Sequence, residues 1–501
     1  MNDQIKQDTV NKAAWAACGT FRGTVDPAIY KDYILVMLFL KYVSDVWQDH
    51  HDEYAREYGN EPALIAEMMK NERFVLPDGA TFSALHARRH EPGNGERIDK
   101  ALSAIEDANL GKLNNVFQDI SFNANKLGEE AQKNDLLRQL LEDFAKRELD
   151  MRPSRIGNLD VIGNAYEYLI KNFASDAGRK AGEFYTPPEV SELMAILMDM
   201  REGEEACDPA CGSGSLLMKC GRRVQEKYGS KKYALFGQES IGSTWALAKM
   251  NMFLHGEDNH RIEWGDTIRN PKLLDGVRKS NMMDGEYKLK HFDVVVANPP
   301  FSLDKWGHDT AESDPYKRFR RGLPPRTKGD YAFILHMVET MKPRTGRMAV
   351  VVPHGVLFRG GAEGKIRQKL IEENLLDCVI GLPEKLLNES GIPAAILILR
   401  KSKPDKDVLF IDASREFKSG KNQNQLTTGP DSNLAKIIAT VEAGQSVPKY
   451  AHLASPEEIK ANEFNLNIPR YIDTFEEEAE IDLVAIRTQR LKLKEELAAL
   501  E

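Results

Sequence analysis

The sequence has little cysteine, no long apolar run and no leader-like start. It holds 5 cysteines among 501 residues, and its first residues, Met-Asn-Asp-Gln, are neither basic nor apolar. So few and scattered cysteines exclude a disulfide framework. A membrane span would need about 20 consecutive apolar residues, and a secretory signal would need a basic and then an apolar region. We therefore expect a cytoplasmic protein.

Positive charge is also in deficit. Lys and Arg number 68 against 77 Asp and Glu, which gives a formal net charge of −9. Because neutralising phosphates supplies most non-specific DNA affinity, a protein that grips duplex DNA alone usually carries a basic excess. If DNA is the substrate, the positive charge must be local or must come from a partner. The hydrophobic share of 42% is otherwise that of a globular chain with room for two or three domains.

Cys207 and Cys211 raise the question of a metal site, because they lie four residues apart. A second Cys/His pair at zinc-like spacing does not accompany them in the sequence. Small residues packed beside a tight turn are the more ordinary interpretation of such cysteines. We predict no metal.

Three regions can be distinguished along the chain. Residues 1–165 are predicted to form a helical domain, because 30–43 is apolar nearly all round and 134–144 repeats leucine at helical spacing. Residues 166–475 contain short apolar runs separated by helical segments, which predicts a doubly wound α/β sheet. Beyond about residue 400 the pattern becomes polar and irregular. The strand candidates are continuous apolar runs, as expected for strands covered on both faces: 233–236, 292–297, 348–352, 378–382 and 394–399.

Residues 476–501 form the third region. Their apolar residues follow alternating three- and four-residue steps: Leu483, Ile486, Leu493, Leu497 and Leu500. This short heptad pattern predicts a helix that docks on a partner helix. A capping helix packed on its own chain explains the pattern equally well.

A glycine turn and two acids indicate a nucleotide-like ligand. The segment 208–215 (Asp-Pro-Ala-Cys-Gly-Ser-Gly-Ser) lies between a predicted strand and a predicted helix over 216–227, where glycines let the backbone approach a ligand. Glu239 follows the second strand, where such folds place a carboxylate on ribose hydroxyls. Asp266 follows a third strand and can accept a hydrogen bond from an adenine amine. A phosphate-binding Gly-Lys-Ser/Thr loop is missing, and a nicotinamide cofactor stays possible at this point.

The segment 293–301 (Asp-Val-Val-Val-Ala-Asn-Pro-Pro-Phe) is the most informative in the chain. A buried strand ends at Asn298, two prolines stiffen the backbone, and Phe301 follows. An exocyclic nucleobase amine is a poor nucleophile, because its lone pair is delocalised into the ring. The Asn298 side-chain oxygen and the Pro299 carbonyl can accept its two hydrogens, which localises the lone pair. Phe301 can then stack on a base flipped out of the duplex.

These motifs resemble those of DNA amino-methyltransferases, and more closely those of the methylase subunits of type I restriction–modification systems. The similar segments span nearly the whole chain: 21–23, 182–190, 208–214, 298–301, 411–414 and 465–471. The resemblance implies S-adenosylmethionine as cofactor and N6 of adenine in duplex DNA as target. It implies three partners besides DNA: a specificity subunit, a second methylase copy and a translocating nuclease subunit. The implied cofactor-binding residues are Tyr185, Thr186, Asp208, Ala210, Gly212, Ser213, Gly214, Glu239 and Asp266.

A basic run follows the catalytic motif. Residues 317–328 contain no acid, and a loop at this place could contact the phosphates beside a flipped base. We predict DNA contacts from Lys317, Arg318, Arg320 and Arg321, although solvated surface is the ordinary role of such a run. For the aromatic residues just beyond it, Tyr331 and Phe333, core packing is favoured over lining the base pocket.

Two other functions fit parts of the pattern. The same type of tetrapeptide serves N4-cytosine and glutamine side-chain methylation. The choice of adenine as the methyl acceptor therefore depends on Phe301 and on the long helical domain. A protein that keeps a cofactor site only to scaffold a complex is the second alternative. The intact motif at 298–301 argues against the scaffold.

Overall fold

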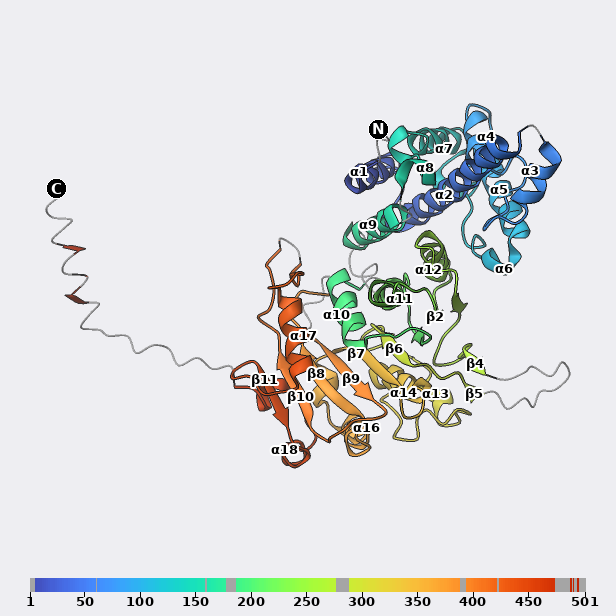
Figure 1. Cartoon of the computed structure of the whole chain (residues 1–501). Coiled ribbons are helices and arrows are strands. Elements are labelled where there is room, and N and C mark those ends of the chain that lie inside the picture. The colour runs from blue at the N-terminus through green and yellow to red at the C-terminus, as the bar shows by residue number, and fades with distance from the viewer. Residues whose placement is uncertain are drawn as a thin grey trace.

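The computed structural model describes residues 5–59, 61–157, 160–176, 186–275, 288–387, 393–420 and 423–473, together with positions 487, 488, 490, 493 and 494. A helical region lies beside a region built on a large sheet (Figure 1). Within the described residues, no helix is long and apolar enough to cross a bilayer. The heptad positions 483, 486, 497 and 500 lie outside the described residues.

The helical region is organised around α2 (Pro27–Tyr58), which has 32 residues. Its apolar stretch is buried nearly all round: Tyr33, Ile34 and Phe39 are 0% exposed, which confirms the predicted buried helix. Helices α3, α4, α7, α8 and α9 contact α2 directly. The other helices of the region are α1 (Gln7–Ala17), η1 (Cys18–Thr20), α3 (Pro62–Met69), α4 (Phe82–Ala87), α5 (Asn94–Ala108), α6 (Leu110–Leu113), η2 (Asn125–Leu127), α7 (Glu130–Phe144), η3 (Arg147–Leu149) and α8 (Pro153–Ile156).

Helix α9 (Asp160–Asp176) joins the two regions. It packs on α1 and α2 with one side and on α12 (Gly242–Leu254) with another (Figure 1). The Tyr166 hydroxyl donates a hydrogen bond to the Leu247 carbonyl, 3.3 Å away. A Cβ on Gly163 would lie 2.6 Å from the His255 ring, so a glycine is needed where the two helices meet. The predicted boundary at 165/166 therefore falls inside a helix, and the helical packing continues through α9.

The sheet of the second region has nine strands in the described residues, in the order β11-β10-β8-β9-β7-β6-β1-β2-β3. Strand β9 is antiparallel to β7 and β8, and β11 is antiparallel to β10; the other pairs are parallel. The strands are β1 (Glu205–Asp208), β2 (Ala234–Glu239), β3 (His260–Trp264), β6 (Val294–Ala297), β7 (Arg347–Pro353), β8 (Leu376–Gly381), β9 (Ala394–Arg400), β10 (Val408–Asp412) and β11 (Ala451–Ala454). A separate pair is formed by β4 (Leu274–Asp275) and β5 (Lys288–Leu289).

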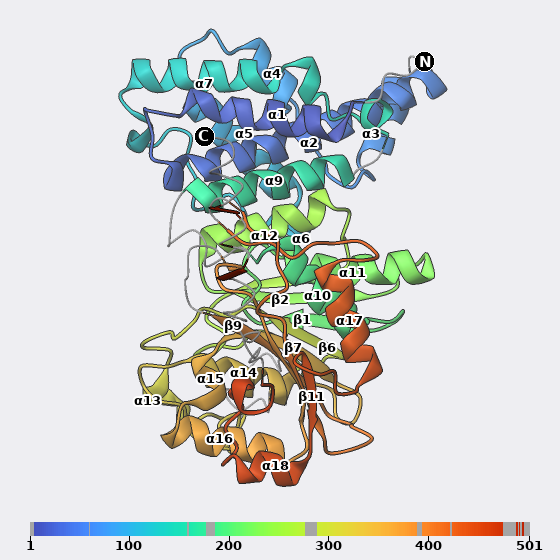
Figure 2. The same cartoon turned by 90° about the vertical axis from the view of Figure 1, so that its left-hand side faces the viewer.

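Helices cover both faces of this sheet (Figure 2). Alternate strand residues enter two cores: Val294 and Val296 belong to one, Val295 and Ala297 to the other. The first core includes α10 (Pro188–Met198), α11 (Ser215–Tyr228) and α17 (Asn433–Ala443), and the second includes α14 (Asp330–Thr340) and α16 (Gly361–Glu372). The predicted doubly wound sheet and its five strands are confirmed. The shorter elements of the region are α13 (His308–Ala311), α15 (Gly355–Phe358), α18 (Pro456–Ala461) and η6 (Ile468–Arg470).

The segment after residue 400 is regular, which corrects the prediction of an irregular region. Strand β10 pairs in parallel with β8, and Phe410 and Ile411 are 0% exposed. The edge strand β11 has only four residues, and α17 packs on α10. Short elements among polar residues give only a weak hydrophobic periodicity, which is why the sequence does not reveal them. Their burial comes from neighbours that are far away in the sequence.

Candidate active site

The carboxyl ends of β1, β2, β3 and β6 meet beside two cavities. Asp208 ends β1, Glu239 ends β2, Asp266 follows β3 by two residues, and Asn298 directly follows β6. The larger cavity has a volume of about 370 Å³ and the smaller one about 10 Å³. In open α/β sheets ligands bind at the carboxyl ends of the strands, so the topology alone marks this edge.

The glycine turn is built tightly against β2. Gly212 and Gly214 have φ values of 53° and 80°, a conformation that favours glycine. The Gly212 N–H donates to Glu239 Oε2 at 3.0 Å. A Cβ on Gly214 would lie 2.8 Å from Met252 Cε, so the turn packs closely against a side chain of α12. Helix α11 begins at Ser215, so its N-terminal N–H groups face the site.

Two buried carboxyl groups lie beside the glycine turn, Asp208 at the end of β1 and Glu239 at the end of β2. Asp208 is 2% exposed and accepts a hydrogen bond from the Ala210 N–H at 2.9 Å. Burial raises the pKa of Asp208 to about 8, and the nearby Glu239 carboxylate adds to the rise. Burial also raises the pKa of Glu239, whose oxygens accept from the N–H groups of Gly212 and Ile241. A cation or a set of hydroxyl donors would stabilise both ionised carboxylates.

Asp266 is fixed by its own turn. One oxygen accepts from the N–H groups of Ile268 and Arg269, each at 2.8 Å, and the other pairs with the Arg269 guanidinium at 2.7 Å. The Thr267 hydroxyl donates to the Pro209 carbonyl at 2.6 Å, which ties this turn to the glycine turn. The carboxylate lines the larger cavity.

Asn298 lines both cavities. Its side-chain N–H donates a hydrogen bond to Thr186 Oγ1 at 3.1 Å, which restrains the orientation of the amide group. Pro299 is buried, and Phe301 is half-buried against the main core. The Ser302 N–H donates to Asp330 Oδ1 at 2.8 Å, so the chain is held directly after the motif.

The structure brings most of the predicted site residues together. The smaller cavity is lined by Thr186, Asp208, Ala210, Gly212, Ser213 and Asn298, among others. The larger cavity is lined by Ala210, Glu239, Asp266 and Asn298, among others. Gly214, Pro299 and Phe301 are not among the described residues that line either cavity. Tyr185 lies outside the described residues.

Much of the basic run, residues 317–328, is not exposed to solvent. This corrects two of the predicted DNA contacts. Arg318 is 3% exposed; its guanidinium pairs with Asp314 and donates to the carbonyls of Thr267 and Ile268. Arg321 is 2% exposed and pairs with Glu339 and Glu373. Guanidiniums buried in this way cannot reach a phosphate, so the prediction is wrong for these two residues. Lys317 is exposed, and Arg320 is largely exposed although it pairs with Glu339.

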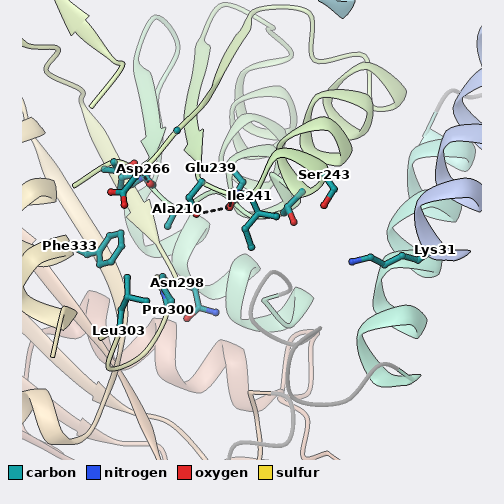
Figure 3. A pocket seen from close by; sticks show the side chains of 15 residues that line it. Lys31, Ala210, Glu239, Ile241, Ser243, Asp266, Asn298, Pro300, Leu303 and Phe333 are labelled. Atoms are coloured by element: carbon teal, nitrogen blue, oxygen red, sulfur yellow. Dashed lines mark hydrogen bonds between the residues drawn. The ribbon is translucent and has the colours of Figure 1, made fainter. Parts of the chain in front are cut away.

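Several lining residues were not identified from the sequence. Ile241, which is 52% exposed, and Leu303 line the larger cavity (Figure 3). Phe333 lines it too, while Tyr331 packs in the core with its hydroxyl on the Val356 carbonyl, as expected. Lys31 reaches the cavity from α2 in the helical region (Figure 3). The sequence signal for Ile241 is an apolar residue shortly after a strand-ending acid; Lys31 has none, because only the fold brings it there.

This fold and this site define a class of enzyme. A doubly wound sheet carries a glycine turn after one strand, acids after the next two, and Asn-Pro-Pro-Phe after a fourth, which is the arrangement of an amino-methyltransferase.

Comparison with known proteins agrees with this class. Residues 157–480 match the family model for N-6 DNA methylase, and residues 10–144 match the model for the HsdM N-terminal domain. The chain is 32% identical over 462 residues to the type I restriction enzyme MjaVII methylase subunit of Methanocaldococcus jannaschii, covering 90% of this chain and 76% of the relative. It is 31% identical over 453 residues to the HindI methylase subunit of Haemophilus influenzae, covering 87% and 94%.

A solved structure agrees as well. The type I restriction-modification methyltransferase subunit from Streptococcus thermophilus is 36% identical and superposes with a TM-score of 0.81, covering 94% of this chain and all of that one. The chain belongs to the N-6 DNA methylase family, as an adenine-specific DNA methyltransferase subunit of a type I restriction–modification system.

Proposed function

We propose that this edge of the sheet holds S-adenosylmethionine, with the adenosine part in the larger cavity and the methionine part beside the glycine turn. The chemistry of the walls supports this division. Glu239 would accept the ribose hydroxyls and Asp266 the adenine amine, between the apolar side chains of Ile241 and Phe333. Asp208 and Thr186, beside the smaller cavity, would hold the amino-acid end. The two buried carboxyl groups suit a ligand that brings positive charge.

The position of Asn298 carries the proposal, because this residue lines both cavities. When bound, the cofactor supplies an electrophilic methyl group on a sulfonium. Asn298 Oδ1 and the Pro299 carbonyl would accept the two hydrogens of the adenine amine, so that the nitrogen lone pair becomes available. The Thr186 contact supports this role, since it occupies the Asn298 nitrogen and leaves the side-chain oxygen as the group that can accept from the amine. Phe301 would stack on the flipped base.

DNA and the other subunits of the system are the proposed partners. A specificity subunit would choose the sequence, with two methylase copies per complex and a translocating nuclease subunit for restriction. The net charge of −9 supports this division of labour, because a separate subunit would supply much of the phosphate contact. From this chain we propose Lys317 and Arg320 as phosphate contacts. We propose a helical domain up to the end of α9, and residues 476–501 as a docking helix for a partner.

The test is methyl transfer by the complex of this chain with its specificity subunit, using labelled S-adenosylmethionine and unmethylated DNA. Asn298→Ala should abolish transfer, while Asn298→Asp should keep part of it because a carboxylate oxygen also accepts the amine hydrogens. The dissociation constant for S-adenosylhomocysteine should change little in either variant. Undiminished transfer by Asn298→Ala would overturn the assignment. Cofactor binding without any transfer by the wild-type complex would favour a scaffold.

A further inference from the structure

The loop that follows the catalytic motif, residues 302–307, is held in an unfavourable conformation. Ser302 and Lys305 have φ values of 51° and 53°, and Gly307 has 111°. Non-glycine residues adopt such values only where surrounding contacts enforce them. One end of the loop is fixed by the Ser302 N–H on Asp330, and Leu303 lines the larger cavity. The geometry of this loop therefore bears directly on the site.

Arg269 fixes the other end of the loop. Its guanidinium pairs with Asp266 Oδ2 at 2.7 Å through one nitrogen and donates to the Lys305 carbonyl through another. Its aliphatic part lies over Gly307, where an added Cβ would come within 2.9 Å of Arg269 Cγ. One planar side chain thus connects the acid after β3 with the loop after β6. Only an arginine offers donors in a fixed fork of this width.

The Asp266–Arg269 pair contributes little by its strength, because the two side chains are 34% and 47% exposed. The pair matters because it links the position of the Arg269 guanidinium to that of the Asp266 carboxylate. Asp266 accepts three hydrogen bonds from residues 268 and 269, so any shift of the carboxylate toward a ligand in the cavity moves the guanidinium with it. Arg318 supports the same turn from inside the protein through the Thr267 and Ile268 carbonyls.

We propose that Arg269 is a positioning residue that couples occupancy of the cofactor cavity to the conformation of loop 302–307. A ligand on Asp266 then orders the loop beside the target base, and by linkage an ordered loop strengthens ligand binding. This inference rests on the proposed cofactor site.

The test is backbone amide hydrogen exchange of the full chain with and without saturating S-adenosylhomocysteine. In the wild type, ligand should slow exchange in both 266–270 and 302–307. In Arg269→Ala the ligand should still protect 266–270, but the response of 302–307 should fall by about fivefold or more, the lower bound of usual coupling strengths. Arg269→Lys should behave like the alanine variant, because a single ammonium cannot span both partners. Arg326→Ala is the matched control, since this arginine is exposed and, among the described residues, forms its ion pair with Asp309.

The outcomes separate this inference from the proposed function. An equal loop response in wild type and Arg269→Ala would overturn the coupling, as would a wild-type loop that does not respond to bound ligand. A wild-type chain that shows no heat of binding with S-adenosylhomocysteine would instead overturn the cofactor site itself. Thermal unfolding of each variant checks that the fold is intact.

Discussion

Glu239 is the carboxylate whose replacement tests the cofactor site most quantitatively. Its two oxygens accept from backbone N–H groups on different segments, Gly212 at 3.0 Å and Ile241 at 2.9 Å, and the side chain lines the larger cavity. In Glu239→Gln the side chain keeps its shape, but one oxygen becomes an NH₂ group. The amide can accept from one of these N–H groups and must oppose the other. The neutral amide also accepts a ligand hydroxyl less strongly than a carboxylate does.

The magnitude follows from these contacts. Hydrogen bonds to charged groups contribute about 1.5–3 kcal/mol and neutral ones about 0.5–1.5 kcal/mol, so the loss per ligand hydroxyl is about 1–1.5 kcal/mol. We expect binding of S-adenosylhomocysteine by Glu239→Gln to be weaker by about tenfold for each ribose hydroxyl that Glu239 accepts. Stability is a poorer readout, because the opposed N–H destabilises the protein while the loss of repulsion with Asp208 offsets part of that cost.

The assay is isothermal titration calorimetry with S-adenosylhomocysteine. Glu263→Gln serves as the matched control, because this glutamate lies on β3 next to β2 but pairs with Arg261 instead of lining the cavity. Its affinity should equal that of the wild type. A Glu239→Gln variant that binds within about twofold of the wild type would refute the role of this carboxylate.

Two further predictions concern charge inside the protein. The pKa of Asp208 is raised from an ordinary 3.8 to about 8, so the folded state holds this proton more tightly than the unfolded state. The group's stabilising contribution is therefore present at low pH and lost as the pH rises toward 8. In urea unfolding between about pH 5 and pH 8, the free energy of unfolding should decline more steeply with pH for the wild type than for Asp208→Asn. Parallel curves for the two proteins would contradict this. Arg318→Ala leaves Asp314, with 4% of its side chain exposed, without its cation, and should lower the free energy of unfolding by about 3–5 kcal/mol. Lys317→Ala should leave stability nearly unchanged and weaken DNA binding instead, so equal losses of stability in the two variants would argue against this distinction.

The features of this protein that its sequence predicts correctly depend on local signals. Strands such as 348–352 were predictable because a strand buried on both faces must be apolar throughout. Asn298, Glu239 and Asp266 were predictable because strand ends in a doubly wound sheet converge. The edge strand β11 was not, because four residues with an exposed side carry no clear period.

The errors have one physical cause, which is that long-range packing decides the environment of a residue. Arg318 belongs to a run that appears in the sequence as a basic surface, yet acids and carbonyls brought from elsewhere in the fold bury its guanidinium. Lys31 lies in a helix with no catalytic motif, and the packing of the helical region brings it to the cavity wall. Helix α9 carries apolar residues that pack on both regions at once, on α1 and α2 in one and on α12 in the other, so its sequence shows no domain border.

The proposed role of Asn298, which lines both cavities, is to prepare the adenine amine for methylation. The most direct measurement is nucleoside mass spectrometry of DNA treated with the complex of this chain and its specificity subunit. We expect N6-methyladenine with the wild type and none with Asn298→Ala, at equal binding of S-adenosylhomocysteine. Methyl label on cytosine or on protein, or N6-methyladenine that persists in Asn298→Ala, would contradict it.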